Sequence, residues 1–373
     1  PPFFQAEDGI RDSVNGLVGS EMCIRDRLAS WLDSSGFQVE IMPLPGNPAK
    51  ANLIATLGRG PGGLVLAGHV DTVPYDAGKW THDPFSLTEA DARLYGLGTS
   101  DMKSFLALAL EAGRDMQAIN LKEPLILLAT ADEETSMSGA RALVDAQRPR
   151  ARHAIIGEPT GLHPVRMHKG ILMEAIRLHG HSGHSSDPSL GNSALEAMHI
   201  VIGAILAWRE ELQEHYRDPL FAVPVPTLNL GHIHGGDNPN RICAECELHI
   251  DLRPLPGMDS KELRGELHHR VRHSLRDSGI STDFESLSAG VPPMETAPDA
   301  PIVTLAEKLT GYPAQAVAFA TEAPYLAQLG MDTVVMGPGD IAQAHQPDEY
   351  LALDRLNPTI NILQQAIKTV CIK

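Results

Sequence analysis

The chain has 373 residues, of which 43% are hydrophobic and 21% charged, so a globular protein with more than one domain is expected. Acidic residues exceed basic ones by 47 − 30 = 17, which excludes the basic face that a nucleic-acid partner needs. No apolar stretch approaches the ~20 residues of a membrane span, so no membrane partner is expected either.

The first 27 residues do not fit the rest of the chain. They do not begin with methionine, and they show no helical or strand period. They also lack the basic start and the apolar core of about 7–15 residues that mark a secretory signal. The run Gln5–Ser13 resembles a translated sequencing adapter. We therefore interpret residues 1–27 as an assembly artefact and assign them no function.

Strands and helices alternate from Leu28 to Lys169. The patterns predict helices over 28–35, 102–118 and 138–146, and strands over 37–44, 52–57, 64–71, 125–131 and 153–156. Such alternation implies a mostly parallel sheet with helices on both faces. In sheets of this kind, ligands bind beyond the carboxyl ends of the strands.

Three of these strands end in acidic residues or histidine. His69 and Asp71 lie two apart, so both can face one way, and Asp71 can hold the second ring N–H of a metal-binding His69. Glu133 and Glu134 follow the next strand, and Glu158 the one after it. One polar strand end is commonplace, and an isolated Glu-Glu pair favours a solvated turn. Three such ends in one sheet favour a site.

Two further side chains complete a metal-binding set. Asp101 opens the helix 102–118, where it can also serve as an N-cap, and His345 follows the last strand. Two imidazoles and three carboxylates suit two adjacent zinc-class ions that share one carboxylate. Glu133 lies beside them without needing to bind, and a free carboxylate there can move a proton from water to a leaving amine. The expected ligands are His69, Asp101, Glu134, Glu158 and His345.

The pattern changes after Lys169. Strands are predicted over 171–178, 227–232, 241–252 and 281–287, with helices over 192–216 and 260–278. The order β-α-β-β-α-β is that of a ferredoxin-like unit. Beyond it the first pattern resumes, with helices over 301–309, 322–329 and 355–370 and strands over 316–319 and 332–336.

The predicted fold class is therefore α/β, a mostly parallel-sheet metallohydrolase domain with an inserted ferredoxin-like domain. The catalytic domain would comprise residues 28–169 and 289–373. The inserted domain would comprise residues 170–288, and its long helix and edge strands could support a dimer.

The chain has four cysteines. Cys243 and Cys246 resemble half a zinc knuckle, but no second pair exists, and both lie in a predicted strand. We interpret them as structural thiols in a reducing, cytoplasmic setting.

Seven stretches of the chain resemble the two-zinc aminoacylase and carboxypeptidase family, and within it the bacterial acetylornithine deacetylase group. They are Gly68–Pro74, Tyr95–Lys103, Ala129–Met137, Ile156–Thr160, Gly183–Pro188, Gly231–Asp237 and Gln343–Tyr350. The resemblance covers about residue 28 to the end. It departs at the amino terminus, where the family's first helix is missing or overwritten.

The resemblance implies two divalent ions per subunit, zinc or cobalt. His69 and Glu158 would bind one ion, Glu134 and His345 the other, and Asp101 would bridge them. It also implies that Asp71 orients His69 and that Glu133 is the general base.

Further residues are implied to act on the substrate. His184 resembles a histidine that reaches into the partner subunit's site and steadies an oxyanion. Asn240 and Arg253 match residues that hold the substrate's carbonyl and α-carboxylate, for which an Arg fork is suited. From the residues alone, His184 could equally be a loop histidine and Arg253 a surface charge. Glu322 could pair with a distal ammonium of the substrate or be an acid at a helix start.

The implied activity is hydrolysis of N-acetyl-L-ornithine to L-ornithine and acetate, a step of arginine biosynthesis, by a cytoplasmic homodimer acting on a small N-acyl amino acid. Two alternatives stay open. One is a related amidase, such as a succinyl-diaminopimelate desuccinylase or a dipeptidase, because one sequence indicates pocket shape poorly. The other is a non-catalytic metal-binding scaffold.

Overall fold

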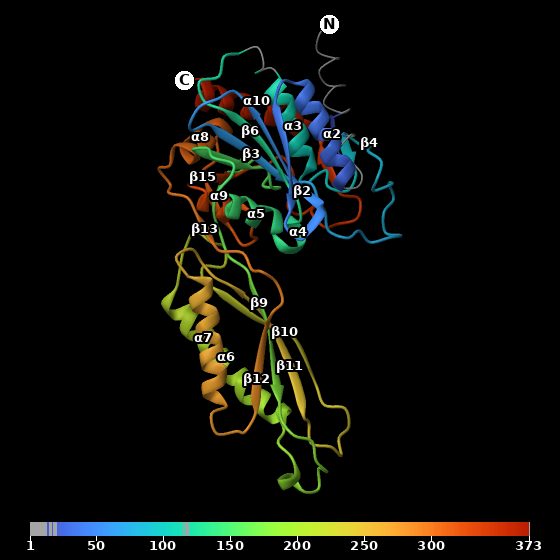
Figure 1. Cartoon of the computed structure of the whole chain (residues 1–373), viewed down its shortest axis with the longest axis vertical. Coiled ribbons are helices and arrows are strands. Elements are labelled where there is room, and N and C mark those ends of the chain that lie inside the picture. The colour runs from blue at the N-terminus through green and yellow to red at the C-terminus, as the bar shows by residue number, and fades with distance from the viewer. Residues whose placement is uncertain (1–12, 15–16, 18–20, 115, 117–118, 373) are drawn as a thin grey trace. The chain divides into compact units, whose positions relative to one another are not determined.

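A computed structural model of the chain describes residues 13–14, 17, 21–114, 116 and 119–372. These residues form two compact units, both visible in Figure 1. Unit 1 contains the described residues up to Arg166, with Thr296–Gln315 and the chain from Thr321 onward. Unit 2 contains Met167–Glu295 and Ala316–Ala320.

Unit 1 is built on a sheet with the strand order β1-β2-β6-β3-β7-β15-β8. The four central strands β6, β3, β7 and β15 are parallel, and the flanking strands pair antiparallel. The bounds are β1 Gln38–Leu44, β2 Asn47–Leu57, β3 Leu64–His69, β6 Leu125–Thr130, β7 His153–Ile156, β8 Val165–His168 and β15 Asp332–Val335. The predicted α/β class with a mostly parallel sheet is confirmed, and its parallel part forms the centre.

Helices cover both faces of this sheet, as Figure 1 shows. On one face α3 packs on β3 and β6 and against α10, with α8 beside α10; on the other, α5 and α9 pack together. Strands β3, β6 and β7 are buried along their whole length, as expected for strands between two helical layers. The helices are α3 Lys103–Arg114, α4 Glu133–Ser136, α5 Ser138–Ala146, α8 Pro301–Thr310, α9 Ala323–Gln328 and α10 Leu356–Ile367. The 3-10 helix η2 Leu353–Arg355 precedes α10, and the π-helix η3 Lys368–Ile372 follows it.

The first described helix, α2, spans Glu21–Ser34, so it begins within the stretch predicted to lack regular structure. That prediction was wrong for its last residues. Ile24, Leu28 and Leu32 are each at most 1% exposed and lie four residues apart, the spacing of one helix face. Ile24 thus extends an apolar stripe whose later members were recognised.

The sequence patterns did not predict several short strands. Between Thr72 and Thr99, where no strand was predicted, lie β4 Thr88–Ala90 and β5 Arg93–Tyr95, which form a small sheet with β16 Tyr350–Ala352. Strands β8 and β13 (Met294–Glu295) were missed as well. Each has two to four residues, too few for an apolar period to show.

Unit 2 has the predicted ferredoxin-like order. Its antiparallel sheet runs β10-β11-β9-β12, and α6 and α7 pack together beside it. Alternate residues of β11, from Cys246 to Leu252, enter its apolar core. The bounds are β9 Leu172–His179, η1 Pro188–Leu190, α6 Ala194–His215, β10 Thr227–Gly235, β11 Glu245–Arg253, α7 Ser260–Ser274 and β12 Ser281–Ser286, and β14 Gln315–Val317 pairs with β8.

Within the described part of the chain, no helix combines the length and apolar character needed to cross a membrane. The four cysteines are free thiols. Cys246 faces the core of unit 2, whereas Cys243 precedes β11 and is not in a strand as predicted.

His168, at the end of β8, is completely buried. Its Nδ1 lies 2.8 Å from the carbonyl oxygen of Lys169, and among the described residues its Nε2 has no hydrogen-bond partner. Burial therefore lowers the pKa of His168 to about 4 from 6.5.

Between pH 6.5 and about 4, the unfolded chain binds a proton at residue 168 that the folded protein does not. The free energy of unfolding should therefore fall by up to about 3 kcal/mol as the pH drops through that window, and not change further on this account outside it. We expect His168→Asn to lose this part of the acid sensitivity in urea titrations at pH 7 and 4.5. His199→Asn, at an exposed site on α6, is the control. An unchanged pH dependence in His168→Asn would contradict the buried neutral state.

Candidate metal centre

The carboxyl ends of the central strands bring the predicted residues of unit 1 to one edge of the sheet. In the parallel register, His69 of β3 lies beside Thr130 of β6, and Ala67 beside Ile156 of β7. His69 therefore ends one strand, while Glu133 and Glu158 follow the ends of its two neighbours within three residues.

Asp101 lies between two groups of side chains. Its Oδ1 is 3.3 Å from His69 Nε2, which is itself 4.0 Å from Glu158 Oε2. Its Oδ2 is 3.4 Å from His345 Nε2, which is 3.2 Å from Glu134 Oε1. All five residues predicted as ligands are thus brought together as two triads that share one carboxylate.

The loop that carries Asp101 is held by a residue from the end of the chain. The Glu349 carboxylate accepts hydrogen bonds from the backbone N–H groups of Gly98, Ser100 and Asp101, at 2.7–2.8 Å. Gly98 is in the left-handed region at φ +82°, and a Cβ there would lie 2.0 Å from the Lys103 side chain. Sequence reasoning missed Glu349. Its only signal was an acid at the end of the motif that contains His345.

Asp71 contacts His69 through its backbone and not, as expected, through its carboxylate. His69 Nδ1 lies 3.0 Å from the backbone carbonyl oxygen of Asp71, and 3.7 Å from its carboxylate. The carboxylate instead accepts the backbone N–H groups of Glu133 and Glu134, both at 3.1 Å. One residue thereby fixes the ring of His69 and the start of α4, from which both glutamates project.

Burial and crowding shift the protonation of the centre. Burial raises the pKa of Glu158 well above its usual range, and the charges of Asp101 and Glu133 raise it further. Burial would also raise the pKa of Asp101, but hydrogen bonds from His345 and His69 hold it below its usual range. The same hydrogen bond to Asp101, with one to Glu134, raises the pKa of His345 to about 10.

For His69, burial lowers the pKa, but the hydrogen bond to Asp101 and the charges of Glu133 and Glu158 raise it well above its usual value. The centre therefore contains more carboxyl groups than its two histidines could balance if all of them were ionised.

The residues present fit two divalent metal ions. Among the described residues, Glu158 Oε1 is a buried carboxylate oxygen without a hydrogen-bond partner, as expected for a ligand atom. Each triad offers one imidazole nitrogen and two carboxylate oxygens, a donor set suited to zinc-class ions. The shared Asp101 directs one oxygen to each triad, as a bridging carboxylate must.

Glu133 lies beside the two triads as a buried carboxylate, 8% exposed. Burial raises its pKa well above the usual value, and the neighbouring carboxylates of Glu322 and Glu134 add to this. A carboxyl group whose pKa is raised in this way is suited to exchange a proton with a reactant.

Glu322 precedes α9 and is 1% exposed. One of its oxygens accepts a hydrogen bond from Thr130 Oγ1 at 2.7 Å, and the other has no partner among the described residues. Burial raises its pKa to about 7.

Besides Glu322, the carboxylate of Asp76 lies near the centre, and the sequence did not indicate it as a site residue. It lines a cavity of about 270 Å³ together with Tyr75, Trp80 and His345. Unlike Glu322 it is exposed, and it forms an ion pair with Lys79 at 2.9 Å.

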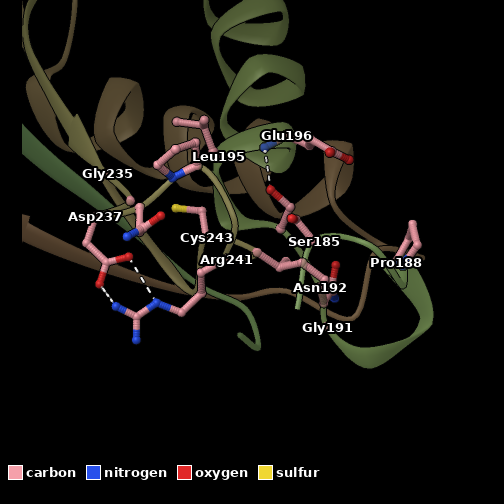
Figure 2. Close-up of a pocket in the computed structure, with 15 residues that line it drawn as sticks. Ser185, Pro188, Gly191, Asn192, Leu195, Glu196, Gly235, Asp237, Arg241 and Cys243 are labelled. Carbon is pink, nitrogen blue, oxygen red and sulfur yellow. Dashed lines mark hydrogen bonds and ion pairs between the residues drawn. The ribbon is translucent and has the colours of Figure 1, made fainter. Parts of the chain in front are cut away.

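His184 and Asn240 lie in unit 2, on two loops that contact each other. Residues 184 and 241 form an antiparallel bridge, and Ser185 N donates to the carbonyl oxygen of Asn240 at 3.0 Å. Both side chains are exposed. The two loops border a cavity of about 710 Å³, in which Figure 2 shows Arg241 paired with Asp237.

Arg253 ends β11, at the opposite end of that strand from these loops. Its Nε lies 2.9 Å from both carboxylate oxygens of Asp251. Within unit 2, the structure thus brings His184 and Asn240 close together and leaves Arg253 apart from them.

Comparison with known proteins gives a family match over most of the chain. The model of peptidase family M20/M25/M40 matches residues 65–369. Among solved structures, this chain is similar to aminopeptidase PepT from Bacillus cereus (TM-score 0.78, 20% identity) and to an M20 family metallo-carboxypeptidase from Sulfolobus solfataricus (0.72, 18%). It is also similar to YXEP of Bacillus subtilis, described as a dinuclear metal-binding peptidase (0.68, 15%). In each case 98% of both chains is covered.

Replacing Glu349 should weaken metal binding without removing a ligand. The amide of Glu349→Gln has one acceptor oxygen for three N–H donors, so the loop of Asp101 loses part of its support. We expect metal affinity, measured by competition with a chelator, to fall about 10–100-fold.

Asp348→Asn is the matched control, because Asp348 also accepts backbone N–H groups, from Thr81 and His82, but holds no predicted ligand. Equal metal affinity in Glu349→Gln and the wild type would show that the loop keeps its position without this carboxylate.

Proposed function

The chain belongs to peptidase family M20/M25/M40, and we propose that it is a two-metal amide hydrolase that converts N-acetyl-L-ornithine to L-ornithine and acetate. The observation that carries the reaction type is the carboxylate of Asp101 shared between two triads, with Glu133 beside them.

Two divalent ions, which we propose to be zinc or cobalt, would be held by His69 and Glu158 on one side and Glu134 and His345 on the other. Bound there, such ions polarise a carbonyl and lower the pKa of water. Asp101 would bridge them, and Asp71 would keep His69 in the binding orientation.

Glu133 is proposed as the general base and acid. Its carboxylate takes one proton from the attacking water as the water oxygen forms a bond to the acetyl carbon. It then delivers that proton to the ornithine nitrogen as the C–N bond breaks. The second proton of the water passes from the new carboxyl group to the amine, which leaves acetate and an ammonium group. Its burial and raised pKa favour both halves of this transfer.

We propose that the substrate is bound partly by unit 2. His184 would steady the oxyanion in the site of a partner subunit, so the active form would be a homodimer. Asn240 would hold the carbonyl and Arg253 the α-carboxylate. The Arg253 guanidinium is already hydrogen-bonded to the carboxylate of Asp251, and the substrate carboxylate would have to replace that contact.

Acetylornithine is proposed because the motifs of the chain resemble that group of deacetylases. Its distal ammonium requires an anionic partner. Glu322 has an oxygen without a hydrogen-bond partner among the described residues but is buried, whereas Asp76 lines the cavity beside His345. Arginine biosynthesis in the cytoplasm would be the corresponding setting.

The second candidate is a dipeptidase or a related amidase such as a succinyl-diaminopimelate desuccinylase. Structures similar to this chain include an aminopeptidase, a tripeptidase from Staphylococcus aureus and the dipeptidase Dug1p of Saccharomyces cerevisiae. A dipeptide presents the same scissile amide and carboxylate, so the reaction chemistry would be shared.

The general-base role of Glu133 has a specific expected signature. Glu133→Gln keeps the shape but cannot take a proton, so we expect turnover to fall by about 10²–10⁴-fold. Metal content, measured by elemental analysis after dialysis, should stay at the wild-type value. Glu134→Gln, one residue away, is the comparison and should lose metal. Metal loss in Glu133→Gln would show that Glu133 is itself a ligand.

The substrate assignment is tested by comparing kcat/KM on N-acetyl-L-ornithine, N-acetyl-L-methionine, N-succinyl-diaminopimelate and a dipeptide, with zinc or cobalt present. We expect acetylornithine to be preferred. Replacing the carboxylate that binds this ammonium group should lower kcat/KM on acetylornithine. The value for acetylmethionine should not change, because acetylmethionine lacks that charge. Glu322→Gln and Asp76→Asn are therefore compared side by side. Preference for the dipeptide would overturn the deacetylase assignment in favour of the second candidate.

A further inference from the structure

The sheet of unit 2 has one apolar face and one charged face. Every second residue of β11 is buried against the helices, from Cys246 to Leu252. The residues between them, including Glu247 and His249, therefore lie on the opposite face and are only partly buried.

A bulge in β10 brings a second histidine to this face. Leu230 pairs with Ile250, but the register then shifts, and His232 rather than Gly231 stands opposite His249. Without the shift, His232 would pair with Leu248 and lie on the apolar side. The extra residue is Gly231, which adds no side chain to either face.

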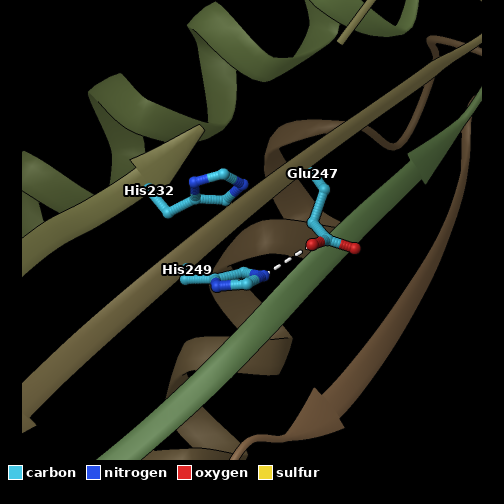
Figure 3. A group of neighbouring side chains, drawn as sticks. All are labelled: His232, Glu247 and His249. Carbon is cyan, nitrogen blue, oxygen red and sulfur yellow. Dashed lines mark hydrogen bonds and ion pairs between the residues drawn. The ribbon is translucent and has the colours of Figure 1, made fainter. Parts of the chain in front are cut away.

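His232, Glu247 and His249 form a compact group, shown in Figure 3. One ligand atom from each lies within 4.8 Å of the others. The centroids of the His232 and His249 rings are 4.7 Å apart, and His249 Nε2 lies 2.5 Å from Glu247 Oε1. Ligands of a tetrahedral zinc ion, each about 2.0–2.2 Å from the metal, lie roughly 3.3 Å apart, so small side-chain rotations would suffice.

The contacts of the group orient its ligand atoms and leave them accessible from solvent. Arg177 pairs with Glu247 through the oxygen that does not face His249, which fixes the carboxylate and leaves its other oxygen directed at the histidines. In the described part of the chain, neither ring nitrogen of His232 has a protein hydrogen-bond partner. The Glu247 and His249 side chains are about 30% exposed, so an ion can enter from solvent.

We propose that His232, Glu247 and His249 bind a zinc-class transition-metal ion, separate from the two-metal centre of unit 1. Two imidazoles and one carboxylate select zinc, nickel or copper over magnesium or calcium, which prefer oxygen ligands alone. The three protein ligands leave a fourth position for water. The ion joins β10 to β11 at the bulge and so stiffens the edge strand of the sheet.

The experiment compares metal-free wild type and His232→Asn, titrated with zinc in the full-length chain. At saturation the wild type should hold one more zinc per chain than His232→Asn, measured by equilibrium dialysis and elemental analysis. Hydrogen exchange gives the location: zinc should slow amide exchange over residues 227–235 in the wild type and not in the variant.

His179→Asn is the matched control, because His179 lies on the same sheet and pairs with Asp283, but belongs to no such group within the described part of the chain. It should behave as the wild type does. If His232→Asn does not fold, judged by circular dichroism, Glu247→Gln replaces it.

Equal zinc content in all variants, with no zinc-dependent change over 227–235, would overturn the proposal and leave the group as a histidine–carboxylate hydrogen bond. Because this readout concerns unit 2 alone, it is independent of whether the chain cleaves acetylornithine.

Discussion

The shared carboxylate of Asp101 is the constraint on which the arrangement of unit 1 depends. Its two oxygens must face two different triads, so neither the loop nor the side chain has freedom to turn. Glu349 supplies the rigidity through three hydrogen bonds to the loop backbone, across 248 to 251 residues of sequence. The centre is therefore complete only where the segment of His345 and Glu349 contacts the loop of Asp101.

This assembly concentrates negative charge where water is scarce. Glu133, Glu158 and Asp101 are each less than 10% exposed, and carboxylates this close repel one another unless they are protonated or share a cation. The raised pKa values of Glu133 and Glu158 favour protonation, and the donor geometry of the two triads fits shared cations. Binding of divalent ions would thus offset an electrostatic cost that the fold itself creates, which couples metal binding to stability.

The sequence predicted the parts of this architecture that depend on local pattern. Helix α5 and strand β7 have the predicted bounds, because buried strands and amphipathic helices carry their period in a few consecutive residues. Of the five residues predicted as ligands, His69, Glu134 and Glu158 converge because the parallel strands β3, β6 and β7 end at one edge. What the sequence did not indicate depends on distant partners. Glu349 acts on residues far away in the chain, and Asp71 uses a backbone oxygen that every residue possesses.

In unit 2, the β10–β11 hairpin also shows what a local sequence pattern cannot predict. Simple alternation predicts which residues of β11 face the core, but one inserted residue in β10 reverses the faces from that point on. The stability of the unit depends on the apolar face, where alternate residues of β11 pack against the core. The other face is not needed for that packing, yet it carries paired charges and the group of His232, Glu247 and His249. The bulge brings these residues together, and the packing of the core does not constrain them. Their side chains can therefore take part in binding.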